Sequence, residues 1–153
     1  MFGALNTPLG GVPAFFVTGV AAGFGYNRAL KLPGVGGVQD FPLVAGVKNG
    51  SFTEGEDADS ALQKLNDVIS PEIGAYWVAA GLRFTTYELL DSLALLFVKF
   101  GREFEIDLLG LTSASLPPDV GKDDALAYIE LAIKVAINPT VGFFSAEAQL
   151  TPN

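Results

Sequence analysis

The sequence predicts a mainly β fold, a twisted antiparallel meander sheet with one amphipathic helix at about 57–70. Residues 74–115 contain three stretches in which polar and apolar residues alternate with the two-residue period of a strand. Similar alternation continues to residue 150, and turn-forming residues separate the stretches. A two-layer α+β arrangement is the alternative.

The domain organisation follows from this pattern. The 153 residues suffice for one domain with a core. We expect a loop-rich lead-in with short strands at 1–56, the helix at 57–70 and antiparallel strands at 74–150. Because the chain ends on a strand with an apolar face, 1–153 is either a single domain or a segment excised from a larger protein.

The lead-in has little regular patterning. Residues Met1–Val12 are rich in glycine and proline and predict a loop, and Arg28–Val38 predicts another. Between them, the sequence allows two short strands, Ala14–Thr18 and Ala21–Tyr26, or one long strand with a bulge.

Two helices are expected before the sheet. Asp40–Val47 fits a short helix with a proline in its first turn. In the helix at 57–70, Asp57 or Asp59 is a candidate cap, and Pro71 is expected to end the helix.

The alternation also suggests which strand faces are buried. In residues 75–86, the set that begins with Tyr76 and Val78 is the more apolar, so we expect it in the core, with Trp77 on the other face. The run Leu90–Phe100 is apolar on both faces, which indicates a strand buried on both sides, although Tyr87–Phe100 also fits a helical stripe.

The later strands show the same contrast between faces. Glu103, Glu105 and Asp107 alternate with apolar residues, so we expect these carboxylates to be solvated. The stretches 125–137 and 141–150 each have one apolar face.

The composition excludes several functions. A net charge of −8 argues against nucleic acid, which requires a basic surface. The absence of histidine and cysteine removes the commonest general base, catalytic triads and most transition-metal sites. The acidic residues Glu54, Glu56, Asp57 and Asp59 lack the spacing of a calcium loop. We therefore predict no enzyme, no cofactor and no metal.

The hydrophobic content of 50% is high, but no uncharged apolar run reaches the length of a transmembrane helix. No signal peptide is visible, so the localisation is unknown and cytoplasmic by default. Clustered aromatic residues suggest a groove for an apolar ligand, although such residues more often belong to the core. Our candidate ligand or interface residues are Phe15, Phe16, Tyr26, Asn27, Arg28, Trp77 and Arg83.

Several segments resemble a family of large, β-rich proteins of bacteria and fungi that is catalogued only as a domain of unknown function. The segments are Pro13–Arg28 (PAFFVTGVAAGFGYNR), Asp40–Val44 (DFPLV), Tyr76–Phe84 (YWVAAGLRF), Phe104–Leu111 (FEIDLLGL) and Leu150–Asn153 (LTPN). The resemblance covers nearly the whole chain and implies that family members are much longer. It supplies no activity and no site residues.

The sequence therefore predicts a structural or assembly module whose sheet edges are completed by neighbouring strands or subunits. Its partner would be a homo-oligomer or the remainder of a larger parent protein. The alternative is part of a β-groove or barrel-like container that binds lipids or other apolar ligands.

Overall fold

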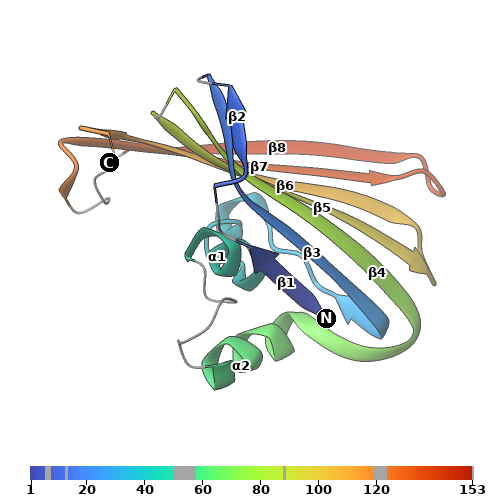
Figure 1. Cartoon of the computed structure of the whole chain (residues 1–153). Coiled ribbons are helices and arrows are strands. Elements are labelled where there is room, and N and C mark those ends of the chain that lie inside the picture. The colour runs from blue at the N-terminus through green and yellow to red at the C-terminus, as the bar shows by residue number, and fades with distance from the viewer. Residues whose placement is uncertain (6–7, 13, 50–57, 88, 119–123, 153) are drawn as a thin grey trace.

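A computed structural model of the chain describes residues 1–5, 8–12, 14–49, 58–87, 89–118 and 124–152. Its main feature is an eight-stranded antiparallel sheet, shown in Figure 1. Six long strands follow one another in chain order: β3 (Phe15–Leu30), β4 (Ile69–Thr86), β5 (Leu90–Gly101), β6 (Glu105–Leu116), β7 (Ala127–Asn138) and β8 (Phe143–Pro152). The predicted mainly β antiparallel fold is confirmed.

The lead-in contains more strand than the sequence predicts. The expected loop at Met1–Val12 is wrong, because β1 (Phe2–Leu5) and β2 (Gly10–Val12) both pair with β3. Likewise, β3 runs on to Leu30, into the second expected loop. The backbone N–H and C=O groups of β3 pair with those of β4 along this whole length, so they are satisfied within the sheet. The glycine-rich composition alone had suggested a loop at its end.

The strand β3 is the single long strand of our second alternative. Its register against β4 shifts between Val17 and Gly19 and again between Tyr26 and Arg28. Asn27 forms the second irregularity with a φ of 51°, and its Oδ1 accepts a hydrogen bond of 2.9 Å from the backbone N–H of Gly74. A bulge of this kind changes the face to which the next side chain points.

The helices α1 (Pro42–Asn49) and α2 (Ala58–Val68) lie between β3 and β4 in the chain, and a short 3₁₀ helix, η1 (Val35–Gly37), precedes them. Figure 1 shows α1 and α2 on one side of the sheet. Both predicted helices are confirmed, but α2 does not extend to Pro71. Ile69 already begins β4, and Pro71 lies opposite Arg28 in the sheet.

The core lies between α1 and the sheet. Leu43, Val44 and Val47 of α1 are buried against Leu95 of β5 and its neighbours. Just before the helix, the ring of Phe41 makes an edge-on contact with the ring of Phe97, with their centroids 6.2 Å apart. We call the side of the sheet that carries this core the covered face, and the opposite side the open face.

The assignment of faces from the sequence is wrong in β4 and β5. Trp77 is 2% exposed and lies on the covered face, whereas its neighbour Val78 is 44% exposed on the open face. In β5, Leu95 is fully buried and Leu96 is 42% exposed, so this strand is not buried on both sides. The helices cover only one side of the sheet, so the more apolar set of β4 lies on the open face.

Small residues make room for the large side chains of the covered face. A Cβ atom at Gly25 of β3 would collide with the indole of Trp77 on the neighbouring strand. Gly25 and Trp77 are direct partners in the register, so the indole occupies the space left by the missing side chain. The glycines of β3 thus serve close packing rather than a loop.

Within the described residues, none of the helices combines the length and the apolar character needed to cross a membrane.

Candidate functional site

From Tyr76 onward, the open face carries no charged side chain on β4 to β8 among the described strand residues. Its outward apolar residues include Leu96 at 42% exposed and Phe144 at 67%. The register places one residue of each strand in rows that cross the sheet, such as the row through Ala80, Leu96, Leu108, Val135 and Ala146. Side chains of this kind normally lie in a core or an interface.

The charged side chains of the same strands lie on the covered face. The expectation that Glu105 and Asp107 are solvated is wrong, because Asp107 is only 1% exposed and Glu105 is partly buried. Glu130 of β7 is similarly buried, at 8% exposed. Glu103 is exposed, as expected. The predicted alternation of polar and apolar residues is present in β6, but its polar side chains lie on the covered face instead of in solvent.

A lysine joins two carboxylates at one end of the covered face. Lys99 Nζ of β5 donates a hydrogen bond of 2.6 Å to Glu105 Oε1, its direct register partner on β6. Asp107 Oδ2 lies 3.1 Å from the same Nζ, close enough for an ion pair but without good hydrogen-bond geometry. The pairing of β5 with β6 therefore builds the cluster.

The cluster shifts the pKa of each member. Burial is the main reason why the pKa of Asp107 rises to about 6, and its hydrogen bond with Glu105 adds to this while Lys99 opposes it. Burial also acts to raise the pKa of Glu105, but the hydrogen bonds from Lys99 and Asp107 outweigh it and the pKa is lowered. Burial would lower the pKa of Lys99, yet the two carboxylates raise it. Such an arrangement lets Asp107 keep its proton up to about pH 6.

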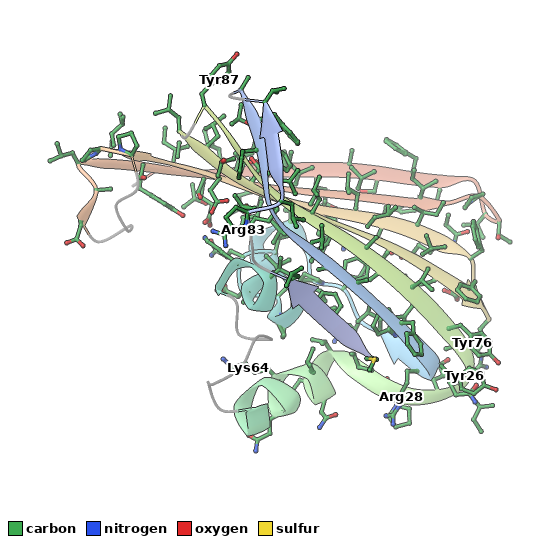
Figure 2. The ribbon with its side chains drawn as sticks, in the orientation of Figure 1. Tyr26, Arg28, Lys64, Tyr76, Arg83 and Tyr87 are labelled. Carbon is green, nitrogen blue, oxygen red and sulfur yellow. The ribbon has the colours of Figure 1, made fainter. Side chains whose placement is uncertain are left out.

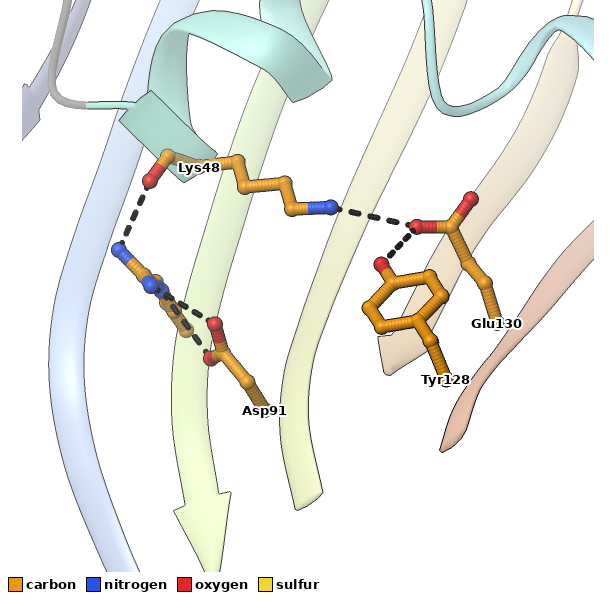
Figure 3. A network of polar contacts seen from close by, with 5 residues as sticks. Lys48, Asp91, Tyr128 and Glu130 are labelled. Carbon is orange, nitrogen blue, oxygen red and sulfur yellow. Dashed lines mark hydrogen bonds and ion pairs between the residues drawn. The ribbon is translucent and has the colours of Figure 1, made fainter. Parts of the chain in front are cut away.

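A second polar network fastens α1 to the sheet (Figure 3). Lys48 Nζ, near the end of α1, lies 3.2 Å from Glu130 Oε2 on β7, and the hydroxyl of Tyr128 donates to the same oxygen at 2.8 Å. Burial and the contact with Glu130 raise the pKa of Tyr128. Arg83 of β4 donates to the backbone carbonyl of Lys48 at 2.9 Å and also pairs with Asp91 of β5. These contacts link four elements and have the character of a structural support.

A cavity of about 470 Å³ opens beside the lysine cluster. This volume is that of a small-molecule pocket. Trp77 and Leu30 are buried apolar residues in its wall, and Ala75 contributes only a methyl group. Six charged residues also line it: Arg28, Glu72, Lys99, Arg102, Glu103 and Glu105.

The structure brings two of the seven candidate residues together in this cavity, namely Arg28 and Trp77. Arg28 reaches it because the irregularity at Asn27 precedes it, and Asn27 itself accepts a hydrogen bond from the backbone of Gly74 in β4. Tyr26 lies apart from the cavity wall, next to Tyr76, with ring centroids 5.3 Å apart (Figure 2).

The remaining candidates lie elsewhere. The ring of Phe15 packs on Phe84, with centroids 4.7 Å apart, near the β2 end of β3. Phe16 pairs with Thr85 in the register, and Arg83 belongs to the network around α1. The seven residues therefore do not form one site. Glu54, Glu56 and Asp57 lie outside the described residues, as does the side chain of Asp59.

Residues 1–153 match the Family of unknown function (DUF6603). The chain belongs to this family. No curated protein and no solved structure shows significant similarity to the chain. The DUF6603 assignment thus names a family without supplying an activity or a site.

Sequence reasoning on this DUF6603 chain missed the role of Lys99 and Asp107. A signal was present, because Lys99 is the single charge within an apolar run and the acids alternate just beyond the next turn. A hairpin through Gly101 places that lysine opposite Glu105, the second of these acids, and this pairing of opposite charges is the signal that the sequence offered.

Proposed function

We propose that the chain is a non-enzymatic assembly module that associates through the open face of its sheet. The observation that supports this most directly is that the described part of this face, from Tyr76 through β8, carries only uncharged side chains, many of them large and exposed. Exposing such a surface to water is unfavourable by about 25 cal/mol per Å² of apolar area. A partner that covers the face removes this cost.

The size of the face suits a stable interface. Five strands about 4.8 Å apart and about ten residues long, with about 3.3 Å per residue, give roughly 800 Å². Each partner in a standard protein interface contributes roughly 800 Å². The face is therefore large enough to hold two chains together without further contacts.

We propose a second copy of the chain as the partner. A twofold interface brings the same surface of both subunits together, so the surface must tolerate itself. An uncharged apolar sheet meets this condition, because no like charges approach each other. Two twisted sheets pack face to face about 10 Å apart with interdigitating side chains. A lipid ligand on the same face is the competing occupant.

The edge of β8 offers a second contact of the kind that the sequence suggested. Within the described residues β8 pairs only with β7, so its outer backbone groups are available to another strand. In this proposal a strand of a neighbouring chain pairs with the edge of β8, and contacts between open faces stabilise the assembly. We also keep as a prediction that the family consists of large β-rich proteins of bacteria and fungi. In that case this chain is one segment of such a protein.

Native mass spectrometry and sedimentation velocity test the proposal. We expect a ligand-free dimer that the substitution Leu96→Glu, in the middle of the open face, converts to monomer. Leu126→Glu is the matched control, since Leu126 is 92% exposed in the segment before β7 and lies off this face. The control variant should remain dimeric.

Three results would contradict the proposal. A monomer that retains lipid mass after purification would favour the container for apolar ligands. A bare monomer at tens of micromolar would exclude both a stable dimer and a resident lipid. A dimer that Leu96→Glu leaves intact would show that the contact lies elsewhere.

A further inference from the structure

The cavity beside Lys99 lies at one end of the sheet, where Tyr76 and Phe100 of the open face also contribute to its wall, and its charged residues do not all have partners. Of the six charged groups that line it, Lys99 pairs with Glu105 at 2.6 Å and Arg102 pairs with Glu72 at 3.1 Å. This leaves Arg28 and Glu103, for which the described residues provide no ion-pair partner. One cation and one anion therefore remain for a ligand.

These two groups stand at opposite sides of the cavity. Arg28 lies on β3, and Glu103 lies in the turn that follows β5, with β4 between these strands. Two steps between neighbouring strands separate the backbones by about 10 Å. The offset along β4 between Pro71, the register partner of Arg28, and Ala75, the partner of Gly101, adds to this distance. A ligand that contacts both groups must be elongated, with its charges at its two ends.

The middle of the cavity suits an apolar segment. Ala75 pairs with Gly101 across β4 and β5, so this row of the sheet has almost no side-chain bulk and leaves a hollow. Leu30 and Trp77 line the hollow and are 7% and 2% exposed. Methylene groups would lie there without displacing a charged contact.

The indole of Trp77 supplies a further indication. Its Nε1 is buried and has no hydrogen-bond partner among the described residues. An N–H group of this kind normally bonds to a protein or ligand acceptor. Trp77 belongs to the wall of the cavity, and its Nε1 lies over Gly25 of β3.

We propose that this cavity binds an elongated zwitterion, such as an ω-amino acid or a short peptide. The ligand carboxylate pairs with the guanidinium of Arg28, which can bind it through two parallel hydrogen bonds. The ligand ammonium pairs with Glu103, and the chain between them crosses Ala75. The equal numbers of acidic and basic residues around the cavity favour a ligand without net charge.

The single tryptophan of the sequence is Trp77, so its fluorescence reports on this cavity alone. The experiment titrates the protein with 6-aminohexanoate and, separately, with hexanoate and hexylamine. These three probes share a six-carbon chain, but each control lacks one of the two charges. We expect saturable binding of 6-aminohexanoate and at least about tenfold weaker binding of each control, because each loses one charge-assisted contact.

Variants identify the residues responsible. Arg28→Gln and Glu103→Gln should each raise the dissociation constant by about tenfold, as expected when one end of the ligand loses its charged partner. Lys64→Gln on α2 is the control for loss of a surface charge and should bind like the parent protein (Figure 2). Circular dichroism melting of every variant confirms that folding is retained.

Three outcomes would overturn the inference. Equal binding of hexanoate and 6-aminohexanoate would indicate a simple anion site at Arg28. Unchanged affinity in folded Arg28→Gln or Glu103→Gln would place the ligand elsewhere. The absence of any saturable response, checked by calorimetry up to millimolar probe, would mean that the cavity does not bind this class of ligand.

Discussion

Arg83 and Asp91 form a two-pronged ion pair between neighbouring strands. Nε and Nη2 of Arg83 donate to the two carboxylate oxygens of Asp91 at 3.1 and 2.7 Å. The remaining nitrogen, Nη1, donates to the backbone carbonyl of Lys48 in the last turn of α1. One side chain of β4 thus holds β5 and also satisfies a carbonyl that the helix itself leaves free.

This relationship predicts a large effect of Arg83→Gln on stability. The substitution removes the pair with Asp91 and leaves the helix end without its donor, so the free energy of unfolding should fall by about 1–3 kcal/mol. Urea denaturation measures this. Arg102→Gln breaks an exposed pair with Glu72 and should cost less than about 0.5 kcal/mol. Equal losses in the two variants would mean that the helix contact adds nothing.

The buried carboxyl of Asp107 predicts a pH dependence. Its pKa rises from 3.8 to about 6 on folding. Between these values the folded chain keeps a proton that the unfolded chain has lost, so this group's stabilisation is complete below about pH 4 and is lost as the pH rises through about 6. Asp107→Asn removes the change. The unfolding free energy of the variant, relative to the parent, should therefore rise by roughly 3 kcal/mol from pH 4 to pH 7.

The other groups of the cluster titrate at the acidic edge of this window or far above it. The lowered pKa of Glu105 contributes stability that is lost as the pH falls below its usual value of 4.5. The raised pKa of Lys99 contributes stability that is lost only as the pH rises above 10.5. Denaturation at several pH values, with Glu147→Gln on the exposed surface of β8 as the control, isolates Asp107. A difference that does not change with pH would show that Asp107 is ionised throughout.

The two faces of β5 predict different effects at adjacent positions. Leu95→Ala opens a cavity in the core and should lower the unfolding free energy by about 2–5 kcal/mol at every protein concentration. Leu96→Ala lies on the open face, so its effect should be small in dilute protein and should grow with concentration if the chain dimerises. Denaturation at two concentrations a hundredfold apart measures both. A concentration-independent loss of several kcal/mol at Leu96 would show that this face is packed within the monomer.

The sequence was sufficient for the strands but not for the lead-in. Turn residues and two-residue alternation predicted β4 to β8 because both are local properties of the chain. The strands β1 and β2 lack such a pattern, and they form because β3 offers them backbone partners. The cavity was equally inaccessible to sequence reasoning, since Arg28, Trp77 and Lys99 come from three strands and meet only through the register.

The sequence by itself determined that strands alternate between an apolar and a polar side and that turn-forming residues separate them. Only the tertiary structure decided which side is covered. Alternation divides a strand into two faces but does not say on which of them other elements pack. The segment between β3 and β4 folds into helices on the side of Trp77, Leu95 and Asp107, so it buries polar groups there in paired form. The more continuously apolar side remains for a partner.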